Sequence, residues 1–466
     1  MQITSHAFLL LFVPLALAGY YWLTKTPRLK MFFLLGASYI FYAFAGLPMV
    51  LVLLGLSLAT FFLARWNRFG WGIVLNLGAL LIFKYLDFGI ENVNTVLKAL
   101  NISFAVGLLK LIVPLGLSFF VFKHIGYLLD VQQKRYPATD DIWAFATYSA
   151  YFPQISAGPI SSFKDTAGQF ASLPERLTSD QVRTSLIYIS LGLAKKIFVA
   201  DTIGQLMASP VNQVTGFSGL IPAWYLVIAY AVQLYFDFSG YTDIVLGVSG
   251  LFGLRLPQNF NNPYLASNPG EFWERWHMSL SMWFRTYLFS PLSRSLLKKW
   301  GSDKREMAQY AANIVTMTLV GLWHGAGWGF ILWGFFHGVY LNFGAWWKRQ
   351  NRTLPFGIEK ILFLFAILLG WALFMSPNGA YLTHLYQQMF GFGGLGSSTL
   401  IKQLLSNNTS LVLLFAIPIT FSGMAEAANF ESKIQINRYV LIALGIVTAI
   451  AILMIEGQTS FIYIQF

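Results

Sequence analysis

Long runs of apolar residues, separated by short polar loops, follow one another along the whole chain. The runs lie at 7–23, 31–45, 48–64, 71–87, 105–129, 142–158, 183–205, 220–236, 240–254, 308–324, 328–346, 358–375, 410–424 and 438–455. One bilayer crossing takes about 20 apolar residues, and several runs are shorter than that. We therefore expect an all-α polytopic membrane protein with about 11 transmembrane helices, together with re-entrant or interfacial helices.

Pro and Gly interrupt two of these runs, 142–158 and 240–254. Broken backbone at membrane depth is tolerated only where protein or a water-filled cavity surrounds it. We expect both runs to be re-entrant segments or half-helices that pack inside the bundle.

The composition agrees with a membrane location. Of the 466 residues, 56% are hydrophobic and only 11% are charged, against about 25% charged in an average soluble protein. The sequence has no fixed-period repeat and no long soluble appendage, so we expect a single membrane domain over residues 1–466. The absence of cysteine excludes disulfides, zinc–thiolate sites, iron–sulfur clusters and a thiol acyl-enzyme intermediate.

The basic residues indicate an orientation. A formal net charge of +12 would suggest nucleic-acid binding in a soluble protein, but here the basic residues lie in short loops, at 25–30, 65–68, 134–135 and 294–305. Such loops are typical of the cytoplasmic side of a membrane with anionic lipids. Since the loop at 88–104 lacks this excess, we expect the N-terminus outside and no nucleic-acid partner.

The segment 268–292 differs from the apolar runs because Glu and Arg alternate with Trp in NPGEFWERWHMSLSMWFRTYLFSPL. This pattern predicts an interfacial or re-entrant helix that packs on the bundle. A second helix is predicted to begin after Thr178, because Gln181 follows three residues later in a capping-box pattern.

Several enzyme classes are excluded by missing motifs. The chain has no Gly-Lys dipeptide, and therefore no phosphate loop for ATP-driven transport. It also lacks a Gly-x-Ser-x-Gly elbow, a His-Glu-x-x-His pair and a His-x-x-x-x-Asp box, which excludes serine hydrolases, zincins and the soluble type of lipid acyltransferase.

Two of the six histidines are candidates for chemistry. His324 ends a stripe with Asn313, Thr316 and Val320, whose spacings of about three to four residues place them near one helical face. An ionisable group at membrane depth usually faces a cavity or the protein interior and is a functional candidate. The alternative is that His324 is a neutral packing residue that bonds a backbone carbonyl.

His277 is the second candidate, because helical spacing would place it on one face with Glu274 and Ser281. The alternative is an interface histidine held by Glu274. We interpret the remaining four histidines as structural; these are His6, His124, His337 and His384.

Asp237 and Asp243 lie in the aromatic and aliphatic segment LYFDFSGYTDIVLG. Buried carboxylates must be paired or neutralised. Their partners are expected among Lys195, Lys196 and Arg255, or among backbone groups freed at a helix break at 239–240. A structural charge network is the favoured interpretation, and an acid, base or ion-relay role is the alternative.

Taken together, the motifs resemble the membrane-bound O-acyltransferase family, most closely its bacterial branch that contains the alginate O-acetylation membrane proteins. The resemblance follows VPLGLSFFVFKHIGYLLDV, YFPQISAGPISSFKDTAGQF and LYFDFSGYTDI, and is most specific in NFNNPYLASNPGEFWERWHMSLSMWFRTYL and GLWHGAGWGFILWGFFHG. A Trp-His-x-Ser-Leu-Ser segment followed 47 positions later by Gly-Leu-Trp-His-Gly is not expected by coincidence.

The resemblance implies a ring of helices around a tunnel in the bacterial cytoplasmic (inner) membrane. It implies acyl transfer from a cytoplasmic thioester, acetyl-CoA, towards hydroxyls of an extracytoplasmic polysaccharide, with periplasmic or extracellular partner proteins. His324 then corresponds to the essential histidine and His277 to the second motif histidine. We expect His324 to be the general base, and neither a bound cofactor nor a metal. The residues expected to bind substrate are Asn313, Trp323, Trp276, Ser279 and Arg285.

The sequence departs from the alginate pattern at two places. Arg285-Thr286 stands where that branch usually has Arg-Asp, and Ser293-Arg294-Ser295 replaces a Gly-Gly-Asn-Arg turn. The teichoic-acid D-alanylation branch shares both Trp-His segments and also lacks that turn, so D-alanyl or other cell-wall acyl transfer is the alternative. A third interpretation is a transporter or flippase of an acyl donor or glycan, although no inverted repeat is visible.

Overall fold

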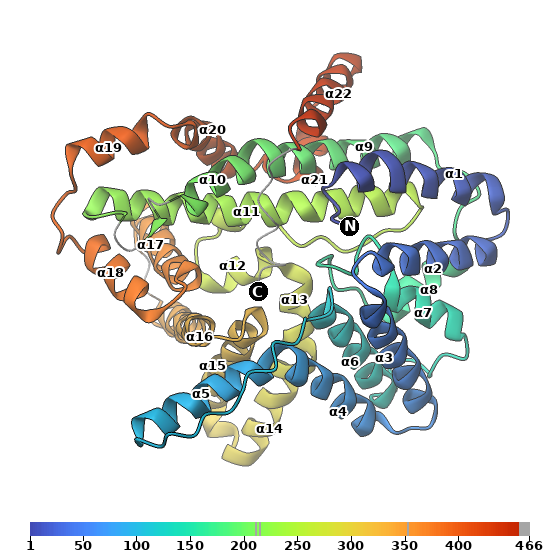
Figure 1. Ribbon diagram of the computed structural model, residues 1–466, viewed down its shortest axis with the longest axis horizontal. Coiled ribbons are helices and arrows are strands. Elements are labelled where there is room, and N and C mark those ends of the chain that lie inside the picture. Colours follow the sequence, from blue (N-terminus) through green and yellow to red (C-terminus); the bar gives the residue numbers. More distant parts are fainter. Residues whose placement is uncertain (210–211, 214–215, 352–353, 456–466) are drawn as a thin grey trace.

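The computed structural model describes residues 1–209, 212–213, 216–351 and 354–455 (Figure 1). Every regular element in these ranges is a helix, which confirms the all-α class. The first part of the chain contains α1 (Val13–Leu23), α2 (Pro27–Ala43), α3 (Leu47–Arg65), α4 (Phe69–Leu80), α5 (Leu86–Ala99), α6 (Leu117–Gln132), α7 (Ile142–Ala150) and α8 (Phe163–Ala171).

The central part carries the candidate site. Its helices are α9 (Ser179–Ala194), α10 (Thr202–Ala208), α11 (Leu220–Leu251), α12 (Pro269–Arg275), α13 (Met278–Phe284), α14 (Ser290–Trp300), α15 (Arg305–His324) and α16 (Trp328–Arg349). The predicted capping box at the start of α9 is confirmed, because the Thr178 hydroxyl accepts from the Gln181 amide and the Gln181 side chain accepts from the Thr178 amide.

The last part contains α17 (Phe356–Met375), α18 (Gly379–Met389), α19 (Ser398–Leu405), α20 (Asn408–Ser422), α21 (Ala427–Lys433) and α22 (Arg438–Leu453). Short π-helical turns widen the chain at η1 (Ala7–Phe12), η2 (Leu81–Tyr85), η3 (Lys195–Asp201) and η6 (Arg285–Phe289), and 3₁₀ turns lie at η5 (Pro263–Leu265) and η7 (Ser302–Lys304). In Figure 1, α22 and α5 project away from the rest of the bundle in different directions.

Four described helical stretches are long and apolar enough to cross a membrane: Leu47–Arg65, Phe69–Ala99, Leu220–Leu251 and Gly357–Met375. The pair Ser398–Leu405 and Asn408–Ser422, bent by 65°, would make a fifth. The expected number of about 11 crossings is therefore not confirmed by length and composition. The difference arises because other apolar runs form shorter helices, such as Ala7–Leu23 and Arg438–Leu453.

The expected half-helix at 240–254 is wrong, because one uninterrupted helix of 32 residues, α11, contains the whole run 220–236 and continues through the run 240–254 as far as Leu251. Gly240 does not break this helix but allows α9 to approach it. A Cβ on Gly240 would lie 2.8 Å from the Gly192 carbonyl oxygen, and a Cβ on Gly192 would lie 2.6 Å from the Gly240 carbonyl oxygen. Figure 1 shows α9 and α11 side by side across the molecule.

The run 142–158 is broken, as expected. Helix α7 ends at Ala150, and the chain then continues through buried, non-helical residues before α8 begins at Phe163. The Gln154 side-chain amide satisfies this backbone, because it donates to the Pro159 carbonyl and to the Ser161 hydroxyl. Irregular backbone inside the bundle is thus held by polar side chains rather than by lipid.

The run 105–129 forms a helix only in its second half. Residues 102–114 have no regular secondary structure, and α6 begins at Leu117. The backbone amides of Leu109 and Lys110 each donate to the Asp87 carboxylate at 2.8 Å. This segment is therefore anchored to α5, and the run is not one continuous span.

Candidate active site

His324 is the last residue of α15 and is only 3% exposed. The helix ends there because Gly325 takes extended backbone, with φ −164° and ψ 152°. Three aromatic rings surround the imidazole edge to face: those of Trp323, Trp333 and Phe374, with ring centroids 5.0, 5.2 and 5.2 Å away. The helix end thus presents the imidazole inside an aromatic enclosure formed by α15, α16 and α17.

His277 lies between α12 and α13 and is fully buried. Its backbone is in the left-handed region, with φ 43° and ψ 54°, which costs free energy for a residue other than Gly and persists only where the surroundings enforce it. The Asn259 carbonyl accepts a hydrogen bond from the Met278 amide at 2.9 Å and holds this turn. The Phe238 ring contacts the imidazole edge to face, with centroids 4.7 Å apart.

The prediction that His277, Glu274 and Ser281 share one helical face is wrong, because the helix is interrupted between Arg275 and Met278. The predicted single helix is instead two short helices at an angle set by the left-handed residue. Glu274 does not hold His277; its carboxylate lies 3.9 Å from the Arg285 guanidinium, and both side chains are largely exposed.

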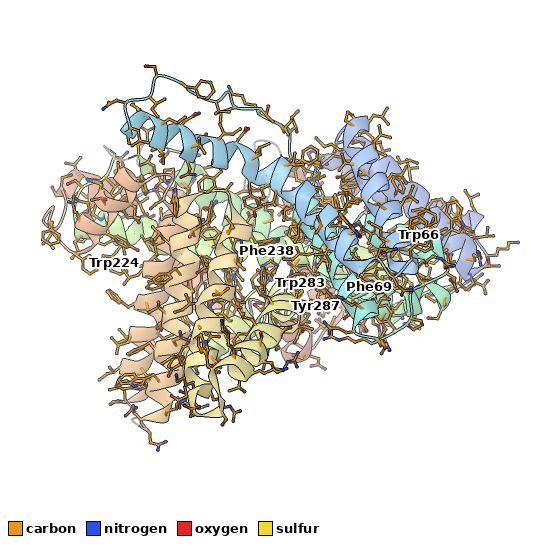
Figure 2. All side chains as sticks on the ribbon, turned by 90° about the horizontal axis from the view of Figure 1, so that it is seen from below. Trp66, Phe69, Trp224, Phe238, Trp283 and Tyr287 are labelled. Atoms are coloured by element: carbon orange, nitrogen blue, oxygen red, sulfur yellow. The ribbon has the colours of Figure 1, made fainter. Side chains whose placement is uncertain are left out.

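One indole connects the two histidines. The Trp323 ring centroid lies 5.0 Å from that of His324 and 5.9 Å from that of His277. The two histidines that the sequence pattern singled out therefore flank the same ring. In Figure 2, Phe238, which contacts His277, lies near the middle of the molecule together with Trp283, whereas Trp66 and Trp224 lie towards opposite sides.

A cavity of about 1540 Å³ lies beside α15. Asn313, Thr316 and Val320 line it, and His324 follows Val320 by about one helical turn on the same face. The Thr316 hydroxyl is buried and has no hydrogen-bond partner among the described residues. The polar stripe predicted from spacing is therefore a cavity wall that leads towards His324.

Asn313 does not lie beside His324. It precedes His324 by 11 positions, which is about 16 Å along an α-helix, and its side-chain amide donates to the side-chain oxygen of Asn342 on α16 at 2.8 Å. It lines the cavity at a distance from the histidine pair.

The other residues expected to bind substrate occupy different positions. Trp276 is 1% exposed and packs on Phe272, with ring centroids 5.6 Å apart, while the Ser279 hydroxyl donates to the Asn259 side chain at 2.6 Å. Neither of these two lines the cavity, whereas Arg285 does. The structure thus brings Trp323 to both histidines and Arg285 to the cavity, and it places Trp276 and Ser279 in packing around the His277 turn.

Asp237 and Asp243 are buried and paired with the two predicted lysines. Lys196 lies 2.7 Å from Asp237, and Lys195 lies 2.6 Å from Asp243. Two further carboxylates join the network: Asp201 at 2.7 Å from Lys196, and Glu426 at 3.9 Å from Lys195. The predicted charge network is present, and Arg255 is not among its ion pairs.

Sequence reasoning missed Trp333, Phe374 and Phe238 as neighbours of the histidines. All three are aromatic residues in apolar helices, and such residues have no local signal that separates a site wall from ordinary core. His337 is buried and packs against Trp333, with ring centroids 4.8 Å apart. This position agrees with the structural interpretation of that histidine.

Residues 137–381 match the model of the membrane-bound O-acyltransferase family. This region runs from just before α7 into α18. It contains both histidines, the residues that line the cavity, and the buried charge network except for Glu426.

Three curated relatives show how far the similarity extends. A probable alginate O-acetylase of Azotobacter vinelandii is 35% identical over 444 residues, covering 91% of this chain and 85% of the relative. A peptidoglycan O-acetyltransferase of Helicobacter pylori is 31% identical, covering 85% and 81%. A teichoic acid D-alanyltransferase of Bacillus subtilis is 29% identical, covering 53% and 63%.

Proposed function

The chain belongs to the membrane-bound O-acyltransferase family, and on that premise we propose that it moves an acetyl group from acetyl-CoA towards the hydroxyls of an extracytoplasmic polysaccharide. It is a multi-pass membrane enzyme, and acyl transfer is the activity of the family. The observation that carries the proposal is the position of His324. It lies in an aromatic enclosure at the end of α15, one helical turn beyond Val320, the last residue of the stripe that lines the cavity, and does not itself line it.

His324 acts as the general base in this proposal. A hydroxyl is a poor nucleophile near neutral pH, and a positioned base contributes about 10²–10⁴-fold. The imidazole takes the hydroxyl proton as the oxygen attacks the thioester carbonyl; the C–S bond then breaks and the proton passes to the leaving thiolate. We propose that His277, whose ring lies 5.9 Å from that of Trp323, orients the substrate or the developing oxyanion. Transfer is direct or uses a further carrier, and any carrier on this cysteine-free chain is not a thiol.

The cavity is proposed to receive the acyl donor. Its volume of about 1540 Å³ exceeds the usual range of about 300–1,000 Å³ for small-molecule pockets, so it has room for a long cofactor-like thioester. Arg285 at its wall provides a cationic group suited to a phosphate. We further propose that the helices form a ring around a tunnel, through which the acyl group reaches the other face.

Changing Arg285 to Gln is expected to raise the KM for acetyl-CoA about fivefold and to leave kcat unchanged, because an exposed charge pair is worth at most about 1 kcal/mol. Steady-state transfer kinetics in detergent measure both constants. Arg294→Gln is the matched control, since Arg294 is exposed on α14 and does not line the cavity. Equal KM values for the two variants would contradict donor binding at Arg285.

The acceptor is proposed to be an exopolysaccharide such as alginate. Full-length similarity to O-acetylases supports acetyl transfer, while similarity to the D-alanyltransferases covers about half of the chain. D-alanyl transfer to teichoic acid is the second candidate, favoured by the missing glycine turn at 293–295. Partner proteins outside the membrane are expected to complete the modification.

Acyl transfer by the purified protein tests the proposed function. The protein in detergent receives labelled acetyl-CoA and, in separate reactions, alginate oligosaccharides, peptidoglycan fragments or lipoteichoic acid. Label in the alginate product is the expected result. Label only in another polymer would overturn the acceptor assignment, and a lack of thioester consumption with every acceptor would favour a transporter or flippase, which needs a membrane to work.

The proposed orientation places the N-terminus outside and the basic segment 294–305, which forms the end of α14 and the turn η7, in the cytoplasm. The absence of native cysteine makes single-cysteine labelling direct. In intact spheroplasts an impermeant maleimide is expected to label Lys98→Cys and not Lys299→Cys; both lysines are exposed. Labelling of position 299 alone would reverse the orientation.

A further inference from the structure

The last carbonyl groups of α15 are contacted by one short segment of a distant helix. Lys84 and Tyr85 end the π-helical turn η2, between α4 and α5. The Lys84 ammonium donates to the carbonyl oxygens of Trp323 at 2.6 Å and His324 at 3.2 Å. The Tyr85 hydroxyl donates to the Leu322 carbonyl oxygen at 2.9 Å.

These contacts satisfy groups that a helix end leaves without intrahelical partners. The last four carbonyls of an α-helix have no amide to accept from, and they carry the partial negative charge of the helix dipole. A cation at this end is stabilising. The helix end in turn stabilises the Lys84 ammonium, which would otherwise be costly among apolar neighbours.

The π-helical turn explains how two consecutive residues reach one target. Neighbouring side chains diverge by about 100° in an α-helix and by less in the wider π-helical turn, and such turns occur frequently at functional sites. Here η2 directs Lys84 and Tyr85 to three successive carbonyls, 322 to 324, at the point where α15 stops.

We propose that Lys84 is a positioning residue for His324, assisted by Tyr85. The two side chains fix the backbone that carries the imidazole, and Gly325 begins the turn directly after it, so no further helical turn holds this end in place. The proposal rests on the proposed function, because a fixed backbone matters only if His324 takes part in proton transfer. Lys84 itself touches the His324 backbone and not the substrate.

Lys84→Met keeps the length and apolar stem of the side chain but removes its ammonium. We expect kcat to fall about 10- to 100-fold, since a displacement of about 1 Å at a reacting group can cost that much, while the KM for acetyl-CoA stays within twofold. Lys84→Arg keeps a cationic donor and is expected to restore most of kcat. Tyr85→Phe removes one hydrogen bond and is expected to disturb folding less than Lys84→Met does. It is expected to lower kcat about threefold to tenfold with KM unchanged.

Lys30→Met is the matched control. The Lys30 ammonium, like that of Lys84, donates to two carbonyl oxygens, those of Pro174 at 2.6 Å and Glu175 at 3.1 Å, in another part of the molecule. It is expected to lower the melting temperature in detergent but not kcat per folded molecule.

Three outcomes would overturn the proposal: a kcat of Lys84→Met within twofold of wild type, an equal loss of kcat in Lys30→Met, or a loss confined to KM. If Lys84→Met does not fold, the same criteria apply to Tyr85→Phe. Activity retained by His324→Gln would instead refute the proposed role of His324 as the general base, on which the positioning role rests. Loss of activity in His324→Gln together with an unaffected Lys84→Met would refute only the positioning role.

Discussion

Replacing His324 with Gln is expected to reduce acetyl transfer about 10²–10⁴-fold, which corresponds to a barrier higher by about 2.7–5.5 kcal/mol. Gln keeps a hydrogen-bonding amide of similar reach, but it cannot accept a proton near neutral pH. Insertion, abundance and melting are expected to stay close to wild type, because the aromatic enclosure still has a planar polar group to pack against. Transfer of labelled acetyl from acetyl-CoA to an acceptor sugar in detergent measures the loss.

His124→Gln is the control for this experiment. His124 is equally buried, and its ring nitrogens lie 3.0 Å from the Asn76 side chain and 2.7 Å from the Ser149 hydroxyl. This substitution should affect stability more than transfer per folded molecule. Substantial transfer by His324→Gln would rule out His324 as the base and move the assignment to His277.

Replacing Lys196 with Met is expected to destabilise the protein by about 3–5 kcal/mol, because it removes the cation that two buried carboxylates share. The Lys196 ammonium lies 2.7 Å from both Asp201 and Asp237, and its side chain is 1% exposed. Met fills similar volume, so the loss would report charge rather than packing. Melting in detergent and protein level in the membrane both measure it.

The triple variant Lys196→Met, Asp201→Asn and Asp237→Asn should recover part of this loss, since it removes the carboxylate charges along with the cation. Lys298→Met, at an exposed lysine of α14, should melt like wild type. If the Lys196→Met and Lys298→Met proteins had the same melting temperature, the buried network would contribute little to stability.

Spacing along one helix was enough to predict the polar stripe that lines the cavity, and the buried carboxylates themselves predicted part of the charge network. The stripe from Asn313 to His324 is read within a single helix, so its shared face follows from 3.6 residues per turn. Lys195 and Lys196 were among the named partners because few other cations lie in apolar segments. Glu426 could not be assigned to this network, since it lies more than 180 positions further along the chain.

The breaks in the chain were the least predictable feature. Gly240 suggested an interruption, yet its lack of a side chain serves contact with α9, and the helix continues. No Gly or Pro marks the break at His277, which depends on Asn259, 18 positions earlier. Both errors have one cause: a local pattern does not contain the neighbouring element that decides the backbone.

The same limit explains why the surroundings of His324 were missed. Phe374 lies in an apolar run like any other, and no local pattern marks Lys84 as a cap for a helix 240 positions away. The residues that carry chemistry were visible as polar exceptions in apolar helices, whereas those that hold them in place were not.

The contact between Gly192 and Gly240 has a consequence for how this fold can vary during evolution. In each direction the atom nearest to an added Cβ is the backbone carbonyl oxygen of the opposite glycine, and every amino acid at that position would supply the same atom. A larger residue on α9 therefore cannot be compensated by a smaller one on α11. The two positions are expected to remain glycine without covarying, so methods that infer contacts from correlated substitutions would not detect one of the tightest helix crossings in the protein.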